Sequence, residues 1–368
     1  MKIGSIELAS PFVVSPMAGM TDTAFRRLVK RQGGCGLVVS EMVSSEGLVR
    51  GIDRTLEYAE YTEEERPVSI QIFGGEPAKM AEAARVVESM GANIVDVNMG
   101  CPVPKIAKHN AGCTLMREPA HAAQIISAMS KAVKIPVTVK MRKGWDEGEM
   151  NAGELAKRVE DAGAKAIAIH GRTAKQSYSG VADWDFVSAI AKTVSIPVFG
   201  SGDCVEPEDI VARMKSGASG VYVGRGVLRN PWILAQARDL MEGRPARTIS
   251  HEERGQFLLD YMHLLLNESM NEEEGFRHSA AARSPQSVAR GPQPAALTLQ
   301  PAAREAVGRE RWVINKIRAL CSWYTKGFEG GAQFRIGVNS VKSINELIDL
   351  IDKFFHVSKI ATITRQLA

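Results

Sequence analysis

The sequence predicts a (β/α)8 barrel, or TIM barrel, followed by a C-terminal helical-bundle domain. Three observations support this α/β fold class. Between residues 11 and 241, a short β-branched apolar run is followed by a turn and an amphipathic helical pattern, and this unit occurs eight times. Continuous apolar strands that alternate with helices are typical of a parallel sheet, and eight such units fit a closed barrel of about 250 residues. After residue 241 only helical patterns remain.

The eight expected strands are bounded by recognisable signals. Pro136 and Pro197 each follow an isoleucine and open a strand, a position where proline costs no ladder hydrogen bond. Glycines at 163 and 217 end the preceding helices, as left-handed caps require. A doubly wound open sheet is the alternative, but it rarely contains eight regular units. The strands are expected at residues 11–15, 36–40, 68–72, 94–97, 136–140, 166–170, 197–200 and 220–223.

The chain is expected to form two domains. Residues 1–241 would form the barrel, residues 242–250 a linker, and residues 251–368 the helical domain. Ser250, with Glu253 three residues later, predicts a capping box where the first helix of the second domain begins.

The second domain contains a segment of different composition. Residues from about 275 to 303 are rich in Ala, Pro, Ser, Gln and Arg and have little apolar periodicity, which predicts a disordered insertion. Helical patterning resumes at Arg304, and another helix is expected over about 341–355.

The composition is that of a globular protein in a reducing compartment. The 368 residues are 45% hydrophobic and 24% charged, and the net charge of +4 does not by itself call for a nucleic acid. The five cysteines include no Cys-x-x-Cys pair, so neither a disulfide framework nor a metal site is expected. We expect neither a signal peptide nor a membrane-spanning helix, because residues 1–7 lack the apolar core of a signal peptide and no apolar run approaches the ~18 residues that a membrane helix needs. We therefore expect a cytoplasmic monomer that does not associate with membranes.

Polar residues follow the expected strands at their C-terminal ends, where TIM-barrel active sites lie. One such residue could be a solvated rim residue, but polar or small residues at all eight strand ends indicate an active site. In strand order, these residues are Ser15 to Gly19, Glu41, Gln71, Asn98 with Cys101, Lys140 with Arg142, His170 with Arg172 and Thr173, Ser201 to Asp203, and Gly224 to Gly226.

Two groups among these residues indicate different parts of a ligand. The small-residue loops 200–203 and 223–226 follow the last two strands, where such barrels commonly bind phosphate, and Arg225 adds a charge. Gln71, Lys140 and His170 could surround a flat polar ligand such as a flavin, whose reduced anionic form a lysine would stabilise. The alternatives are an ordinary turn for Gly-Arg-Gly, a Schiff-base or ion-paired lysine, and a core histidine.

A thiol loop follows the fourth expected strand. Cys101 lies three residues after Asn98, between Gly100 and Pro102, which restrict the backbone on either side. An isolated cysteine here would ordinarily be a small buried residue. Cys113 is a second thiol farther along the same loop, and we interpret it as structural.

Taken together, these motifs resemble the tRNA-dihydrouridine synthase family, most closely its bacterial B-type member. The resemblance covers about residues 1–241 and resumes at Trp323-Tyr-Thr-Lys-Gly327. The motifs are Pro16-Met-Ala-Gly-Met20, Asn98-Met-Gly-Cys-Pro102, Val139-Lys-Met-Arg142, His170-Gly-Arg-Thr173, residues 178–184 and Gly224-Arg225.

The resemblance implies an oxidoreductase in which an FMN-bound barrel and a helical tRNA-binding domain reduce a D-loop uridine to 5,6-dihydrouridine with NADPH. Cys101 would donate a proton to the uracil, and Asn98, Arg142, Arg172 and Arg318 would contact the substrate. The residues implied to line the FMN ring are Pro16, Met17, Ala18, Gln71, Lys140 and His170. Those implied to hold its phosphate end are Ser201, Gly202, Asp203, Gly224 and Arg225.

The sequence departs from the family pattern at two places. Ser201 stands where the family usually has Asn, and the run Lys316-Ile-Arg-Ala-Leu-Cys-Ser322 is less basic than usual ahead of the Trp-Tyr pair. Arg318 remains a candidate RNA contact there.

Basic and aromatic residues are interleaved in the same part of the chain, a combination that suits phosphate contacts and base stacking. They are Arg304, Arg309, Arg311, Trp312, Lys316, Arg318, Trp323, Tyr324 and Lys326. The alternative is an amphipathic helix with a solvated face and an aromatic core.

Two other functions remain open on the same residues. One is a barrel enzyme for a small metabolite, such as a flavin dehydrogenase of the dihydroorotate dehydrogenase type or a non-redox phosphosugar enzyme. The other is a catalytically silent RNA-binding protein.

Overall fold

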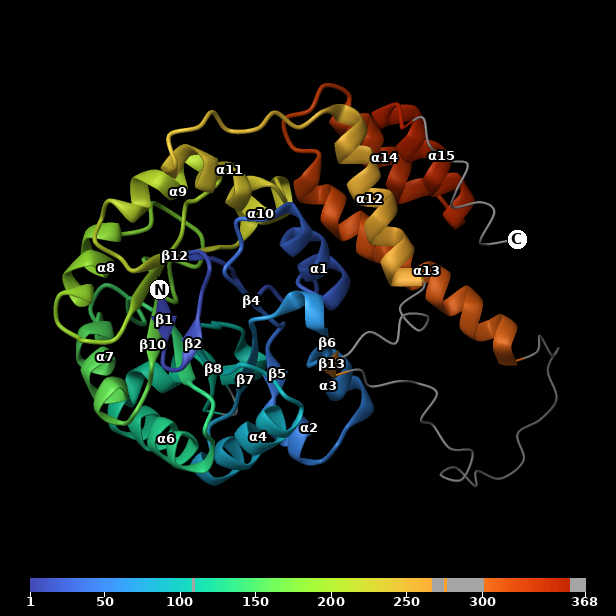
Figure 1. Cartoon of the computed structure of the whole chain (residues 1–368). Helices are drawn as coiled ribbons and strands as arrows, with labels where there is room; N and C mark the ends of the chain where they lie inside the picture. Colours follow the sequence, from blue (N-terminus) through green and yellow to red (C-terminus); the bar gives the residue numbers. More distant parts are fainter. Residues whose placement is uncertain (108–109, 267–274, 277–300, 358–368) are drawn as a thin grey trace, which may run out of the picture. The chain divides into compact units, whose positions relative to one another are not determined.

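The computed structural model describes residues 1–107, 110–266, 275–276 and 301–357 (Figure 1). The described chain separates into two compact units. The first contains the described residues up to Arg247 together with 275–276, and the second contains the other described residues from Thr248 onward. None of the described helices is both long and apolar enough to cross a membrane.

Eight parallel strands close a barrel in the first unit, which confirms the predicted fold class. Their order is β4-β3-β12-β11-β10-β9-β8-β7, and β7 pairs back with β4. A short additional strand, β5 (Val43–Ser44), pairs with β7. The barrel strands are β3 (Phe12–Val14), β4 (Leu37–Val39), β7 (Val68–Phe73), β8 (Ile94–Met99), β9 (Val137–Arg142), β10 (Ala166–His170), β11 (Val198–Ser201) and β12 (Gly220–Val223).

Helices lie around the outside of the strands (Figure 1). The short strands β6 (Tyr61–Thr62) and β13 (Gly275–Phe276) pair antiparallel, and two 3-10 segments are η1 (Glu63–Glu65) and η2 (Gly112–Arg117). The helices are α1 (Thr23–Gln32), α2 (Ser45–Val49), α3 (Asp53–Tyr58), α4 (Pro77–Ser89), α5 (Pro104–Ala107), α6 (Pro119–Ala132), α7 (Ala152–Asp161), α8 (Trp184–Ala191), α9 (Pro207–Met214), α10 (Arg225–Arg229) and α11 (Ile233–Met241).

Local sequence explains where several of these helices begin. The Asp22 side chain accepts a hydrogen bond from the Phe25 N–H and caps α1, and Asp183 caps α8 in the same way. Proline opens α4, α6 and α9, where its missing N–H is not needed. These capping residues and prolines therefore mark where the loop after a strand ends and the next helix begins.

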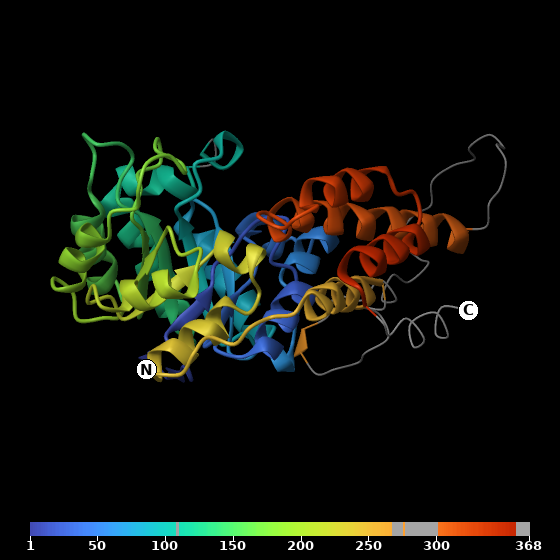
Figure 2. The same ribbon diagram turned by 90° about the horizontal axis from the view of Figure 1, so that it is seen from above.

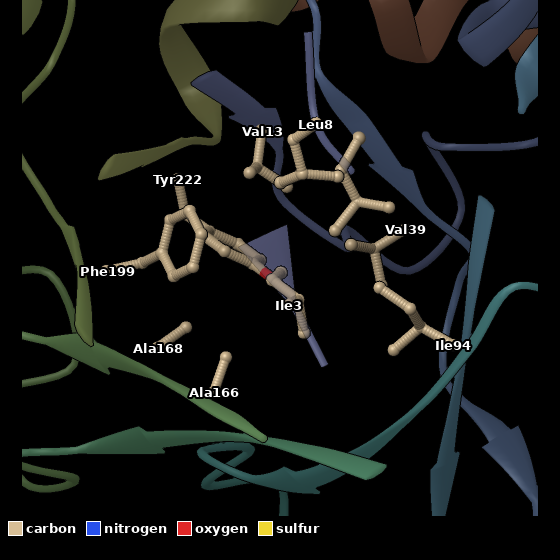
Figure 3. Packing of buried hydrophobic residues seen from close by; sticks show 10 residues of the cluster. Ile3, Leu8, Val13, Val39, Ile94, Ala166, Ala168, Phe199 and Tyr222 are labelled. Atoms are coloured by element: carbon tan, nitrogen blue, oxygen red, sulfur yellow. The ribbon is translucent and has the colours of Figure 1, made fainter. Parts of the chain in front are cut away.

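The N-terminal end of the barrel is filled by apolar side chains. The hairpin of β1 (Lys2–Ile3) and β2 (Ile6–Glu7) contributes Ile3, and Leu8 follows it. Both side chains are buried against barrel residues that include Val39 and Ile94 (Figure 3). This packing leaves the opposite, C-terminal end as the end at which polar side chains gather.

The barrel interior becomes polar toward that end. Side chains of a strand alternate between faces, so Ile94, Asp96 and Asn98 share the face of β8 that points inward. On β10 the inward series runs from Ala166 and Ala168 to His170. Alternation thus places the functional side chains directly above an apolar floor.

The described part of the second unit consists of four helices, coloured from yellow through orange to red in Figure 2. They are α12 (His251–Leu266), α13 (Pro301–Tyr324), α14 (Gly331–Ser340) and α15 (Ile344–Phe355), so the predicted helical C-terminal region is confirmed. Phe257 and Tyr324 stack at 5.8 Å between ring centroids, and Phe355 packs edge-on against Phe334. The predicted capping box is also present, because Ser250 and Glu253 exchange backbone–side-chain hydrogen bonds.

Residues 242–250, the predicted linker, connect α11 to α12. Most of the predicted insertion, 277–300, lies outside the described residues. At its edges the structure differs from the prediction. Gly275 and Phe276 form β13, and α13 begins at Pro301, three residues before the predicted start at Arg304.

Candidate active site

A pocket opens at the C-terminal end of the barrel strands. It brings together nine of the eleven residues predicted to bind a cofactor, from the ends of β3, β9, β10, β11 and β12. Its lining consists of Ser15, Pro16, Met17, Lys140, His170, Tyr178, Ser201, Gly202, Asp203, Cys204, Val205, Tyr222, Gly224, Arg225 and Gly226. The other two predicted residues lie elsewhere, since Ala18 is exposed beyond Met17 and Gln71 is buried within the barrel.

Lys140 supplies a positive charge inside this pocket. Its ammonium makes no hydrogen bond or ion pair with the part of the chain that the structure describes. Burial and the neighbouring Arg142 charge lower the pKa of Lys140 from 10.5 to about 8, although Asp96 opposes this shift. The lysine is therefore available to an anionic group of a ligand.

His170 is an uncharged imidazole in this setting. Burial, followed by the charges of Lys140, Arg142, Arg172 and Arg225, lowers the pKa of His170 to about 2. The Arg172 Nη1 lies 3.4 Å from His170 Nε2. A neutral histidine can offer one donor and one acceptor to a polar ring system.

The loop after β11 is held by an ion pair between the buried Arg172 and the partly exposed Asp203. Arg172 donates from Nη2 to both Asp203 carboxylate oxygens, at 2.7 and 2.8 Å. The Ala182 N–H donates to Asp203 as well. Burial opposes ionisation of Asp203, but these hydrogen bonds and the Arg172 and Arg225 charges lower its pKa. Asp203 is thereby kept as a carboxylate beside the pocket.

Close packing explains the small residues of this loop. A Cβ on Gly200 would lie 2.0 Å from the Trp184 ring, and one on Gly202 would lie 2.5 Å from the Ala182 Cβ. The Trp184 Nε1–H donates to the Gly202 carbonyl at 3.0 Å. Gly202 also has φ of +121°, a value that L side chains rarely adopt. Trp184 was part of a sequence motif, but its position under this loop was not predicted.

Arg225 and Tyr178 face each other across the rim of the pocket. The Arg225 guanidinium carbon lies 4.6 Å from the Tyr178 ring centroid, and its Nη2 lies 3.9 Å from Asp203. Tyr178 is 60% exposed. Arg225 therefore keeps part of its charge available at the end of the pocket where the sequence predicts a phosphate.

Cys101 lies on the loop after β8. Its N–H donates to Asn98 Oδ1 at 2.9 Å, and its carbonyl accepts from the Cys113 N–H at 3.0 Å. The side chain is partly exposed, and burial raises the pKa of the Cys101 thiol. Cys113 is fully buried, and burial raises its pKa to about 12. Both thiols are protonated near neutrality, but Cys101 is the more accessible of the two.

Two arginines predicted to contact substrate are occupied within the protein. Arg142 donates to the carbonyls of Gly100, Thr173 and Ser177, at 2.8 to 2.9 Å. Arg172 is 2% exposed and also donates to the Ser179 and Gly180 carbonyls. These contacts favour positioning roles for both arginines, and their contact with a substrate stays a prediction.

A polar cluster under the pocket was not predicted from the sequence. Asp96 accepts hydrogen bonds from Gln71 and Thr138, and Gln71 accepts one from Asn98. Asp96 and Gln71 are each 1% exposed. The signal that could have revealed Asp96 is its position two residues before Asn98, which places both side chains on one face of the strand.

The candidate RNA-contacting residues of the second unit have mixed environments. Arg318 donates to the Val338 and Val341 carbonyls at the end of α14, which is a structural contact. Tyr324 is buried, so the core interpretation is correct for this residue. Lys326 lies 4.0 Å from the centroid of the Trp323 ring, and Lys316 lies 5.6 Å from that of Trp312. The side chain of Arg304 is outside the described residues.

No cluster of three or more potential metal ligands among His, Cys, Asp and Glu occurs within residues 1–107, 110–266, 275–276 and 301–357.

Comparison with known proteins agrees with this geometry. The family model described as Dihydrouridine synthase (Dus) matches residues 13–306. The chain belongs to this family. It is thus an enzyme of the oxidoreductase class, and the resemblance noted in the sequence is confirmed.

Three relatives illustrate the extent of the similarity. A probable tRNA-dihydrouridine synthase from Rhodobacter capsulatus is 47% identical over 66% of this chain and 76% of its own length. A probable tRNA-dihydrouridine synthase 1 from Synechocystis is 34% identical over 98% of this chain and 90% of its own. A tRNA-dihydrouridine synthase B from Pseudomonas aeruginosa is 40% identical over 64% of this chain and 71% of its own. The dihydrouridine synthase similarity therefore includes B-type members and extends into the helical unit.

Proposed function

We propose that this protein reduces a D-loop uridine of tRNA to 5,6-dihydrouridine, with FMN as the bound cofactor and NADPH as the reductant. The main support for this proposal is one pocket that contains Lys140, neutral His170 and Arg225. The loop that carries Cys101 follows a nearby strand of the same barrel. The similarity to tRNA-dihydrouridine synthases supports tRNA as the substrate.

The pocket residues fit a flavin mononucleotide. Lys140 lines the pocket and would face the polar edge of the ring system, where its charge would favour the reduced anion. At the other end, Arg225 and the backbone of Gly202 and Gly224 would hold the phosphate. Pro16 and Met17 offer apolar contact to the ring. The donors and the apolar surface are those that a flat, anionic cofactor requires.

A flavin held by the pocket residues would, when reduced, supply a hydride for carbon-6 of the uracil. The protein then has to protonate carbon-5, and the Cys101 thiol carries the proton at neutral pH because burial raises its pKa. Asn98 holds the Cys101 backbone through its side-chain oxygen. General acid catalysis of this kind contributes roughly 10²- to 10⁴-fold to a rate.

The helical unit would bind the tRNA. A uridine must leave the base stack to enter a barrel pocket, which costs a few kcal/mol, and contacts elsewhere on the RNA can offset this cost. Lys316, Lys326 and the exposed Trp312 are suited to contacts with phosphates and bases. We expect the protein to act as a monomer in the cytoplasm.

The direct test uses purified protein, NADPH and a tRNA transcript that carries no modifications. We expect bound FMN and the formation of dihydrouridine, detected by mass spectrometry as a nucleoside two mass units heavier than uridine. Turnover of NADPH with dihydroorotate-type metabolites, without dihydrouridine in the tRNA, would instead support the small-metabolite dehydrogenase. Protein that neither retains FMN nor modifies tRNA would contradict the proposal.

A further inference from the structure

Beneath the pocket, polar side chains form a continuous hydrogen-bonded series across three barrel strands. Thr138 on β9 donates its hydroxyl to Asp96 Oδ1 at 2.6 Å. Gln71 on β7 donates from Nε2 to Asp96 Oδ2 at 2.7 Å. Asn98 on β8 donates from Nδ2 to Gln71 Oε1 at 2.7 Å. Two carboxamides are thus linked in sequence to one carboxylate.

The series ends at the loop that carries the thiol. Asn98 Oδ1 accepts from the backbone N–H groups of Gly100 and Cys101, at 3.1 and 2.9 Å. Hence the series connects a buried carboxylate to the backbone of the candidate proton donor.

The two ends of the series fix the direction of every bond in it. Backbone N–H groups can only donate, so Asn98 must turn its oxygen toward Gly100 and Cys101. A carboxylate can only accept, so Gln71 must turn its NH2 toward Asp96. With both ends set, the Asn98 NH2 meets the Gln71 oxygen, and no other orientation of the two carboxamides satisfies all partners.

Burial makes this orientation costly to change. Asp96 and Gln71 are each 1% exposed and Asn98 is 9% exposed, so solvent cannot replace a lost partner. Burial also raises the pKa of Asp96. The polarity survives protonation of Asp96, because a proton on Oδ1 can be donated to the Thr138 hydroxyl and Oδ2 still accepts from Gln71.

We propose that Asp96 is a positioning residue whose acceptor oxygen orients Gln71 and Asn98 and thereby fixes the backbone that presents the Cys101 thiol. Its importance for turnover rests on the proposed function, whereas its effect on the loop can be measured without turnover. Gln71, which the sequence predicts to line the flavin ring, also orients Asn98 in this series.

Two uncharged substitutions of similar size at Asp96 distinguish a role in orienting the carboxamides from a role in filling space. In Asp96→Asn, the amide oxygen can still accept from Gln71 while its NH2 donates to Thr138 Oγ1. In Asp96→Leu, no acceptor remains for Gln71. Hydrogen exchange at the Gly100 and Cys101 amides, followed by mass spectrometry, should be about tenfold faster in Asp96→Leu than in Asp96→Asn. Exchange on β12 is the internal control and should differ little between the variants.

A double variant that exchanges the carboxylate and the carboxamide between positions 71 and 96 tests whether protection of the loop can be restored. Gln71→Glu places a second carboxylate against Asp96 and should accelerate exchange at Gly100 and Cys101. In the double variant Gln71→Glu with Asp96→Asn, the new amide donates to Glu, so the hydrogen bond between positions 71 and 96 runs in the opposite direction. The Glu still accepts from Asn98, so the native orientation of Asn98 is kept. Exchange and the rate of Cys101 alkylation by iodoacetamide should then approach those of the unmodified protein.

Two outcomes would overturn the proposal. One is equal exchange at Gly100 and Cys101 in Asp96→Asn and Asp96→Leu. The other, if Gln71→Glu folds, is a double variant no better protected than that single variant. The same variants, reduced and mixed with tRNA, report on function separately. The variants could lose protection of the Gly100 and Cys101 amides as expected and still form dihydrouridine at the normal rate. That result would count against the role of Cys101 but would leave the positioning role of Asp96 intact.

Discussion

Lys140 is a charged residue in surroundings that disfavour its charge. Its pKa falls from 10.5 to about 8, so the folded protein binds fewer protons at this site than the unfolded chain between these pH values. Stability in the absence of a ligand should therefore rise with pH across this window, by the linkage between proton binding and folding. A bound anion would remove this cost, which is the physical reason for placing such a lysine in a cofactor pocket.

Lys140→Met tests this explanation in the flavin-free protein. We expect the variant to be more stable than the unmodified protein at pH 7, by about 1 to 3 kcal/mol, and to lose the rise in stability between pH 8 and 10. Denaturant unfolding at several pH values measures both effects. Lys143→Met is the matched control and should give no gain, because Lys143 lies near the Glu147 and Asp183 carboxylates. A less stable Lys140→Met at pH 7 would show that burial does not penalise this charge.

The His170 imidazole affects the stability of the folded protein on the acidic side of neutrality. Its pKa of about 2 lies below the usual 6.5, so the unfolded chain binds the extra proton first as the pH falls. The stability contributed by neutral His170 is present above about pH 6.5 and is lost progressively below it. Nuclear magnetic resonance titration of the ring should show no protonation down to pH 4.5 in the folded protein. A ring that titrates near pH 6.5 would contradict this environment.

Arg225 is expected to hold the phosphate end of the cofactor. Arg225→Ala should increase the dissociation constant for FMN by about 10-fold or more, since charge-assisted hydrogen bonds are worth roughly 1.5 to 3 kcal/mol. Arg229→Ala is the control on the same short helix, because Arg229 does not line the pocket and lies near Glu206. Equal flavin retention in the two variants would remove Arg225 from the phosphate site.

Sequence reasoning identified the residue types of the site better than their partners. The choice of Lys140, His170 and Arg225 was possible because each lies at, or directly after, the C-terminal end of an expected strand. The same reasoning from sequence position selected Arg142, Arg172 and Arg318 as substrate contacts. In the structure these arginines donate to carbonyls or carboxylates within the protein. Such acceptors lie on segments whose approach depends on the folded chain, so spacing alone could not reveal them.

At the scale of elements, glycines in the helical unit differ in what surrounds them. A Cβ on Gly255 in α12 would lie 2.3 Å from Val357 Cγ2 and 2.5 Å from Phe355 Cβ. A Cβ on Gly308 in α13 would meet no atom within 4 Å among the described residues. The first glycine therefore permits helix packing, whereas the second only weakens its own helix.

Gly255→Ala and Gly308→Ala should consequently have opposite effects. We expect the first to destabilise the helical unit by about 1 to 3 kcal/mol through overpacking. The second should stabilise it by about 0.5 to 1 kcal/mol through helix propensity. Thermal unfolding followed by circular dichroism compares them, and a stabilising Gly255→Ala would contradict the packing of α12 against the end of α15.

The barrel strands were predictable because each is a short apolar run between turn signals. The β1–β2 hairpin, α2, α3 and α5 were not predicted, since each spans six residues or fewer and offers no full period of a pattern. The alternation along β8 did contain Asp96, but an acidic residue inside a strand has meaning only once Gln71 and Thr138 are seen beside it.

At the scale of the whole molecule, the net charge of +4 is too small to account for tRNA binding by a general field. Binding must then depend on local groups, and the lysines that accompany exposed or half-exposed tryptophans are the strongest candidates. Their partners in the RNA would be phosphates, which makes the affinity dependent on salt.

The pair Lys316→Ala and Lys326→Ala should weaken tRNA binding and lower the slope of log affinity against log salt by about two. Reduction of the flavin by NADPH should be unchanged, because it does not involve the RNA. The control pair is Lys342→Ala and Lys353→Ala, two exposed lysines of the same unit. If both pairs weaken binding equally, the affinity reflects total charge and not these positions.

The most direct test of the central claim is a single turnover of the reduced holoenzyme with unmodified tRNA in the absence of oxygen. We predict that flavin absorbance returns with one dihydrouridine formed per flavin. Cys101→Ala should slow this step by about 10²- to 10⁴-fold, and Cys113→Ala, the buried thiol of the same loop, should change it only a few-fold. Reoxidation of Cys101→Ala at the unmodified rate, or no reoxidation of the unmodified enzyme by tRNA, would contradict the account.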